Sequence, residues 1–194
     1  MKNDVLIKGR VATKLKLDYE FENEKFYRFY LHSTRTGGTI DIIPVIVSEK
    51  LIDPAADYTN KWMCISGQYR SFYSHDGEKT KLLLYIFVNR IMENDDKCET
   101  NDVLIEGEIA KEPVFRETPN GRLITDLLIA VKRNYSKSDY IPCIAWGRNA
   151  IGVSTAKVGT EVRLAGRIQS REYNKDGAKK IAYELSINLL EVVS

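Results

Sequence analysis

An internal repeat constrains this chain more than any other feature of its sequence. The segment NDVLIKG at residues 3–9 returns as NDVLIEG at residues 101–107, an offset of 98 positions. Later matches keep the same order at an offset of 98 or 99: Ile43-Pro44 with Ile141-Pro142, Gly67 with Gly166, Ser71 with Ser170, and Asn89 with Asn188. Chance similarity does not preserve both order and spacing, so the repeat indicates a duplicated domain. We therefore expect two domains, residues 1–97 and residues 98–194.

Each copy is predicted to consist mainly of β-strands. β-branched and aromatic residues favour strands, and they are concentrated at residues 5–7, 40–47, 82–88, 103–105 and 183–193. Tight hairpin turns need positive φ angles, which three dipeptides readily supply: Asn120-Gly121, Asp76-Gly77 and Asp176-Gly177.

One helix-like segment per copy lies at about the same place, near residues 49–60 and 149–158, although Pro54 limits the first. Five strands with a short helix between strands 3 and 4 is the element order of the OB fold, a small Greek-key barrel. The predicted fold class is therefore all-β, with two tandem OB barrels. A β-sandwich is the alternative, but its seven or so strands need more turn signals than this sequence holds.

Composition and charge exclude few classes of protein. With 43% apolar and 29% charged residues, the chain has the composition of a folded globular protein. The net charge is +2 and each half contributes +1, so charge alone does not indicate nucleic acid. Such a partner has to be argued from where the basic residues stand and from their neighbours.

Cys64, Cys98 and Cys143 are odd in number, widely separated and match no metal-ligand spacing. We therefore expect no disulfide, metal or other cofactor, and a reducing cytoplasm fits best. No apolar run is long enough to cross a bilayer and no signal segment is found, so no membrane partner is expected. The sequence also lacks a Gly-rich phosphate loop and a nucleophile paired with a base, so we expect no enzyme.

The second half carries a more specific pattern. Its markers are Pro113, Arg116, Asn120-Gly121, Ile129-Ala130-Val131, the strand from Tyr140 to Trp146, Gly159, Gly166 and Gln169-Ser170-Arg171-Glu172-Tyr173. In the joint order and spacing of these markers, residues 101–193 resemble the bacterial single-stranded-DNA-binding protein family. The resemblance implies a non-enzymatic protein that binds single-stranded DNA without sequence preference in replication, recombination or repair.

The resemblance also implies which side chains contact the DNA. The positions that match the family's stacking aromatics are Tyr135, Tyr140, Trp146 and Tyr173. Every base offers a flat π-face, so stacking does not depend on sequence and contributes roughly 1–3 kcal/mol per base. Basic residues between these aromatics are candidates for phosphate contacts: Arg116, Arg122, Lys132, Arg133, Lys137, Arg148, Arg171 and Lys175. An ordinary solvated position is an equally good interpretation of each basic residue, and of Tyr135.

Strand alternation separates the two sides of residues 140–146. The small apolar residues on one side are predicted to fill the barrel: Ile141, Cys143 and Ala145. The residues on the other side are predicted to face outward: Tyr140, Pro142, Ile144 and Trp146. Core packing is the usual role of an isolated Tyr or Trp, but the interleaved basic residues and the family resemblance favour ligand binding here.

The first copy has lost three stacking aromatics. Gly37, Ile42 and Ser48 stand where the second copy has Tyr135, Tyr140 and Trp146. Arg35 is retained opposite Arg133, and Phe72 and Tyr73 are retained as aromatics. Two interpretations of these three residues are open: contact with a nucleic-acid strand that runs past, or positions in the core and at the rim of the barrel. We expect the first barrel to serve mainly the architecture of the protein.

Assembly and cellular role are expectations from the same resemblance. The family usually assembles four barrels, so a chain with two is expected to form a homodimer. Family members commonly carry an acidic C-terminal tail that recruits partners, and Leu190 to Ser194 do not resemble one, so such recruitment is not expected. The expected location is the cytoplasm, associated with the nucleoid. RNA remains a possible ligand, and an adaptor module of a primosome or mobile element, with weak nucleic-acid affinity, is the alternative function.

Overall fold

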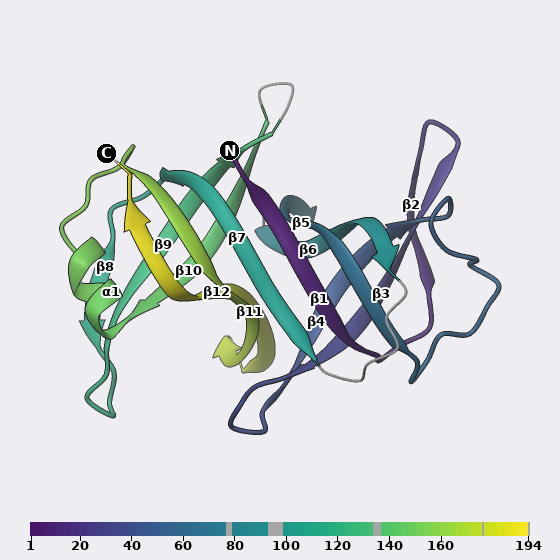
Figure 1. Ribbon diagram of the computed structural model, residues 1–194, viewed down its shortest axis with the longest axis horizontal. Coiled ribbons are helices and arrows are strands. Elements are labelled where there is room, and N and C mark those ends of the chain that lie inside the picture. The colour runs from purple at the N-terminus through teal and green to yellow at the C-terminus, as the bar shows by residue number, and fades with distance from the viewer. Residues whose placement is uncertain (77–78, 93–98, 134–136, 176, 194) are drawn as a thin grey trace. The chain divides into compact units, whose positions relative to one another are not determined.

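The computed structural model describes residues 1–76, 79–92, 99–133, 137–175 and 177–193 (Figure 1). The chain divides into two compact units. The N-terminal unit comprises Asp4–Tyr69 and Leu84–Asn101, and the C-terminal unit comprises Met1–Asn3, Arg70–Leu83 and Asp102–Ser194. The segment Arg70–Leu83 therefore comes from the first repeat but belongs to the C-terminal unit. The proposed boundary between residues 97 and 98 lies outside the described residues and stays a prediction.

Among its described residues the first repeat has six strand segments: β1 (Asn3–Val11), β2 (Lys16–Phe21), β3 (Glu24–Thr34), β4 (Ile40–Ser48), β5 (Trp62–Asp76) and β6 (Lys79–Met92). Their order is β2-β3-β4-β6-β5-β1, and a further β1–β3 pairing closes the barrel. β4 and β6 pair in parallel, whereas β1–β3, β1–β5, β2–β3 and β3–β4 are antiparallel. β1 and β2 both pair with β3, so they are two segments of one barrel strand.

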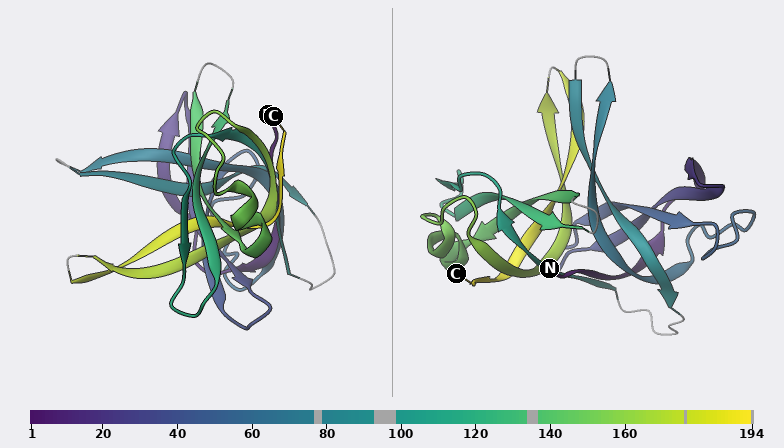
Figure 2. Two further views of the ribbon diagram at one scale, coloured as in Figure 1. Left: turned by 90° about the vertical axis from the view of Figure 1, so that its left-hand side faces the viewer. Right: turned by 90° about the horizontal axis from the view of Figure 1, so that it is seen from above.

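The second repeat has the same topology. Its strands are β7 (Thr100–Ile109), β8 (Val114–Glu117), β9 (Leu123–Lys132), β10 (Ser138–Trp146), β11 (Glu161–Lys175) and β12 (Ala178–Val192). Their order is β7-β11-β12-β10-β9-β8, and a β7–β9 pairing closes the barrel. The parallel pair is again the third and fifth strands of the barrel, β10 and β12. Two tandem OB barrels are therefore confirmed. β11 and β12 continue out of their barrel as a long hairpin, drawn in yellow-green (Figure 2).

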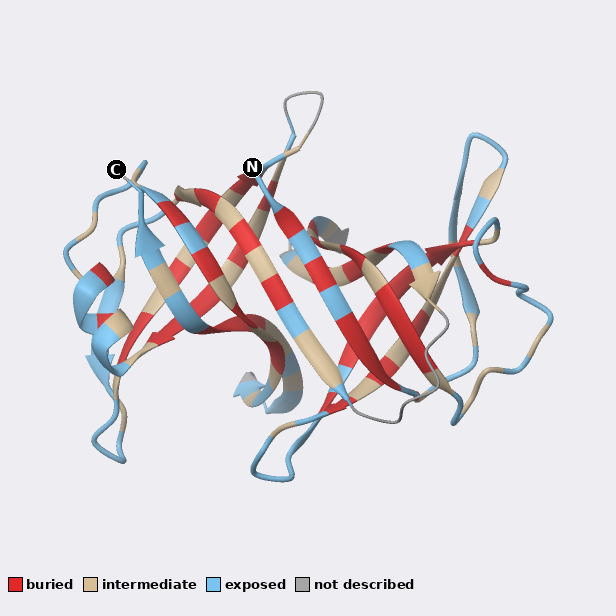
Figure 3. Cartoon of the chain, in the orientation of Figure 1, coloured by how far each residue is buried: buried red, intermediate tan, exposed pale blue. Residues whose placement is uncertain are grey.

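Alternating side chains build the core of each barrel. In β7 the buried residues Val103, Ile105 and Ile109 alternate with partly exposed ones (Figure 3). In β9 the residues Ile129 and Val131 are buried in the same way. Full burial of one such aliphatic side chain stabilises the fold by roughly 1.5–3 kcal/mol. The alternation fixes which face of each strand is left for other contacts.

The single helix within the described residues is α1 (Gly147–Val153), which follows β10. It starts earlier and ends earlier than the predicted segment 149–158. Ala150 and Val153 are buried, and the Thr125 hydroxyl donates a hydrogen bond to the Ala150 carbonyl at 2.8 Å. These contacts hold one side of the helix against the barrel.

The expected helix near residues 49–60 in the first repeat is wrong, because residues 49–60 form turns and irregular structure instead. The Asp53 carboxylate accepts a hydrogen bond from the Ala55 amide at 3.0 Å, and that of Asp57 accepts one from the Thr59 amide at 2.9 Å. Such local bonds compete with helical hydrogen bonds, and Pro54 has no amide hydrogen to donate.

Gly67 and Gly166, which occupy equivalent positions in the repeats, allow two strands to approach closely. A Cβ atom at Gly166 would lie 2.1 Å from the Ser186 carbonyl oxygen, and one at Gly67 would lie 2.2 Å from the Phe87 carbonyl oxygen. The pairing of β11 with β12 also shifts register between Ala165 and Gly166. A shift of this kind bends a strand, so the barrel needs glycine at this bend.

Candidate nucleic-acid interface

The outward side of β10 carries two of the predicted stacking residues. The interior residues are at most 3% exposed: Ile141, Cys143 and Ala145. Tyr140 and Trp146 lie on the opposite side and are half-buried. Ile144 departs from the expected pattern, because it shares their side of the strand but is buried. Strand alternation therefore leaves part of both aromatic side chains accessible.

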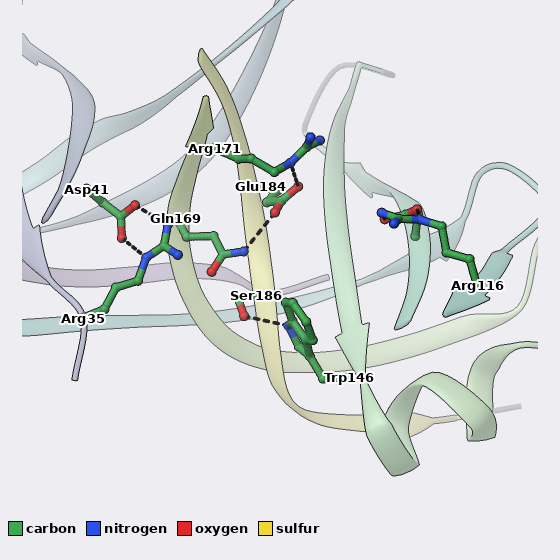
Figure 4. Close-up of polar contacts among 9 residues, drawn as sticks. Arg35, Asp41, Arg116, Trp146, Gln169, Arg171, Glu184 and Ser186 are labelled. Atoms are coloured by element: carbon green, nitrogen blue, oxygen red, sulfur yellow. Dashed lines mark hydrogen bonds and ion pairs between the residues drawn. The ribbon is translucent and has the colours of Figure 1, made fainter. Parts of the chain in front are cut away.

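Trp146 is oriented by a hydroxyl of β12. Its indole Nε1–H donates a hydrogen bond to Ser186 Oγ at 3.0 Å (Figure 4). Ser186 is only 9% exposed, so this acceptor is largely shielded from water. The bond satisfies the single polar group of the indole and fixes the plane of the ring.

A polar network continues from this point along β11. The Gln169 amide donates to Glu184 Oε1 at 2.9 Å, and Arg171 Nε lies 3.9 Å from Glu184 Oε2 (Figure 4). The Arg171 guanidinium in turn lies 5.9 Å from the centre of the Tyr173 ring, a cation–π distance. The stacking face is the name used below for this set of outward residues: Tyr140, Trp146, Gln169, Arg171, Tyr173, Glu184 and Ser186.

Glu184 contributes a negative charge to the stacking face. Its side chain is almost buried, and its negative charge adds to burial in raising the pKa of the Cys143 thiol. An uncompensated carboxylate at this position would repel phosphates. Arg171 offsets that charge, and its own side chain is exposed toward solvent.

Glu184 and Ser186 were not among the predicted site residues. The signal that reveals them is the alternation in β12, where both flank the buried Leu185. Their equivalents in the first repeat are Tyr85 and Phe87, so polar residues stand at these two positions only in the second copy.

Arg116 lies on the β8–β9 hairpin and is paired with an acidic neighbour. Its Nε and one terminal nitrogen donate to the two carboxylate oxygens of Asp126 at 2.6 and 3.2 Å. Hydrogen bonding to Asp126 raises the pKa of Arg116, and burial opposes this only in part. Both side chains remain exposed, so the guanidinium is held in position while staying accessible.

Arg133 binds the carboxylate of Asp139 and a backbone carbonyl of β5. Its Nε donates to the buried carboxylate of Asp139 at 2.6 Å, and a terminal nitrogen donates to the Ser71 carbonyl at 3.0 Å. In the N-terminal unit Arg35 binds the equivalent buried Asp41 at 2.9 and 2.7 Å (Figure 4). The arginine retained in both repeats thus pairs with a buried aspartate six residues later, which is a folding interaction.

The remaining predicted basic residues are scattered on the surface. Lys132 forms an ion pair with Glu108, and this contact raises the pKa of Lys132. Arg122 and Arg148 are exposed, and no ion pair of either side chain is found within the described part of the chain. Lys137 is also exposed. Tyr135 and the side chain of Lys175 lie outside the described residues.

The equivalent positions in the first repeat are occupied differently. Ile42 is an exposed aliphatic residue. Ser48 is buried and donates a hydrogen bond to Glu24, which also pairs with Lys50. These two contacts, with Lys50 the stronger cause, lower the pKa of Glu24. The position of Trp146 is therefore filled in the first repeat by a residue that makes a local polar contact.

Two further features of the described residues bear on function. Nowhere in the described ranges are three or more His, Cys, Asp and Glu side chains grouped so that they would hold a metal ion. Separately, none of the described helices has the length and hydropathy of a bilayer-spanning segment.

The fold and this face define a class: tandem OB barrels in which the second barrel presents aromatic and basic side chains outward. Residues 100–193 match the model of the Single-strand binding protein family. The C-terminal half of the chain is therefore similar to this family.

Curated relatives match part of the chain, and a solved structure shares its fold. "Single-stranded DNA-binding protein A" of Bacillus subtilis is 32% identical over 102 residues, which cover 47% of this chain and 59% of the relative. "Single-stranded DNA-binding protein 3" of Streptococcus agalactiae serotype V is 30% identical over 88 residues, covering 42% and 64%. The chain thus spans less than two thirds of these relatives. The single-stranded DNA binding protein from Thermus aquaticus shares the fold with a TM-score of 0.79 at 18% identity, covering 100% of this chain and 93% of that chain.

Proposed function

We propose that the protein binds single-stranded DNA without sequence preference, by stacking bases on the stacking face of its second barrel. The observation that carries the proposal is the placement of Tyr140, Trp146 and Tyr173 on the outward side of adjoining strands, each half-buried. Aromatic rings that are half-buried and face outward offer a π-face to any base. The relatives named as single-stranded DNA-binding proteins support the same function. The proposal includes a cytoplasmic, nucleoid-associated role in replication, recombination or repair, without catalysis.

Phosphate contacts are assigned to five exposed basic residues of the second barrel: Arg116, Arg122, Lys132, Arg148 and Arg171. Arg133 is assigned mainly to folding, because its guanidinium is bound by the buried Asp139. Tyr135 is retained in the proposal on the family resemblance alone.

The salt dependence of binding distinguishes these two roles. Each phosphate contact to a single strand contributes about 0.7 to the slope of log affinity against log salt. We expect Arg148→Gln and Arg171→Gln each to reduce this slope by about 0.7. Arg133→Gln should instead lower the urea midpoint of unfolding and leave the slope unchanged in the folded protein. Equal slopes for all three variants would contradict the assignment.

The hydrogen bond from Trp146 to Ser186 gives a smaller effect. Ser186→Ala removes this hydrogen bond, whose net contribution is about 0.5–1.5 kcal/mol, and predicts about two- to tenfold weaker binding of a dT oligomer. Ser154→Ala is the matched control, because the Ser154 hydroxyl donates only to the Ile151 carbonyl at the end of α1. Identical affinities of the two variants would show that Ser186 does not position Trp146.

A fluorescence titration tests the proposed function as a whole. Trp62 and Trp146 are the two tryptophans of the chain, so Trp62→Phe leaves Trp146 as the only one. Titrating this variant with a dT oligomer, a rU oligomer and duplex DNA at two salt concentrations should show salt-sensitive quenching with the single strands and little with the duplex. Quenching by rU as strong as by dT would extend the function to RNA. No quenching by any of the three would favour an adaptor role.

We also propose that two chains associate into a homodimer with four barrels. The support is the duplicated OB barrel within one chain and the tandem OB fold shared with the Thermus aquaticus protein. Sedimentation velocity at micromolar concentration should show a particle of about twice the chain mass of 22.2 kDa. A monomer at that concentration would overturn this part of the proposal.

A further inference from the structure

A segment of the first repeat is built into the C-terminal unit. Ser71, in the outer part of β5, donates its amide to Asp139 Oδ1 at 2.6 Å. Its hydroxyl accepts a hydrogen bond from the Tyr140 amide at 2.8 Å, and its carbonyl accepts the bond from Arg133. Ser71 and Asp139 are both buried. All three polar groups of Ser71 therefore hold β5 against the strand that carries Tyr140.

This clamp places Tyr73 beside the stacking face. Side chains alternate along a strand, so Tyr73 points to the same side as Ser71, whereas Phe72 points to the other. The centres of the Tyr73 and Tyr140 rings lie 6.3 Å apart, and the ring planes meet at 56°. At this separation and tilt the two rings are not stacked face to face. Tyr73 is also 44% exposed, so a π-face of this ring is open to a ligand.

We propose that Tyr73 is a further base-stacking residue, contributed by the first repeat to the binding surface of the second barrel. The proposal rests on the proposed function of the stacking face. Two tilted rings at this separation suit adjacent bases, because an unpaired strand can rotate between one base and the next. The first repeat would then act in binding through β5, although it has no aromatic residue at the positions equivalent to Tyr135, Tyr140 and Trp146.

Four variants of the full chain test this role by the affinity for a dT oligomer. Tyr73→Ala and Tyr73→Leu both remove the π-face, and the second keeps apolar volume in case the first disturbs folding. Both are expected to weaken binding about five- to tenfold, near the lower end of a base-stacking contribution. Tyr73→Phe keeps the ring and should bind within about twofold of the wild type. Phe72→Ala is the matched control, since Phe72 is 56% exposed on the opposite side of the strand.

Each outcome decides between a stacking role and a structural one. Weaker binding by Tyr73→Leu, with Tyr73→Phe and Phe72→Ala unchanged, supports the proposal. Wild-type affinity of Tyr73→Leu overturns it, and so does an equal loss in Phe72→Ala. Trp146→Ala is measured beside them: if it weakens binding while Tyr73→Leu does not, the stacking face stands without Tyr73. If the wild-type protein does not bind the oligomer at all, the proposed function itself fails.

Discussion

Replacing Tyr140, Trp146 and Tyr173 together by Ala is expected to weaken binding of a dT oligomer by at least about 100-fold. A stacked base contributes roughly 1–3 kcal/mol, and 1.4 kcal/mol corresponds to a tenfold change in affinity. Even the lower values for three rings sum to about 3 kcal/mol. The three side chains are half-buried on the outer side of the barrel, so the fold should survive the change. Fluorescence anisotropy of a labelled oligomer measures the effect.

Two controls make this result specific. Replacing the same three residues by Phe keeps every π-face and should retain affinity within about tenfold. Phe21→Ala removes an exposed aromatic of the N-terminal unit and should bind as the wild type does. If the triple Ala variant binds normally while remaining folded, the stacking face is not the DNA site.

The largest expected effect on stability comes from Gly166→Ala. The added Cβ would lie 2.1 Å from the Ser186 carbonyl oxygen, a backbone atom that cannot move without breaking the β11–β12 pairing. Forced overpacking of this kind lowers the free energy of unfolding by about 3 kcal/mol. Urea unfolding followed by circular dichroism should show a clearly lower midpoint.

Gly152→Ala is the matched control for this variant. Gly152 lies in α1, and a Cβ atom there would meet no atom within 4 Å. Alanine in a helix is more favourable than glycine by up to about 1 kcal/mol, so the midpoint should stay or rise. A midpoint for Gly166→Ala equal to that of Gly152→Ala would show that the strands do not need their close approach.

The repeat and the alternation of side chains predict most of this fold. Similar segments that recur in the same order at nearly one offset are a strong signal of a duplicated domain. The two-residue period of a strand predicts which residues are interior, such as Ile141 and Ala145. The same reasoning wrongly predicted a helix near residues 49–60, where the chain forms turns instead. There, side-chain carboxylates of Asp53 and Asp57 bind nearby amides, and such local competition leaves little trace in apolar periodicity.

The candidate site was predictable only in part. The aromatic positions came from the family resemblance, and alternation placed Tyr140 and Trp146 outward. The role of Arg133 could not be predicted from its charge, because that role depends on Asp139, which is buried at the start of the next strand, β10. The sequence also gives no sign that Ser71 binds Tyr140, since that contact joins residues of different repeats. Ion pairs and long-range contacts depend on the folded arrangement, which no local pattern encodes.

Photo-crosslinking tests the central claim most directly, because it reports which side chains touch the bases. A dT oligomer substituted with 5-iodouracil is bound to the full chain, irradiated, and the modified peptides are mapped by mass spectrometry. The account predicts adducts on Trp146, Tyr140 and Tyr173, and their suppression by excess unlabelled dT oligomer. Adducts confined to aromatics of the N-terminal unit, such as Tyr19 and Phe21, would contradict it.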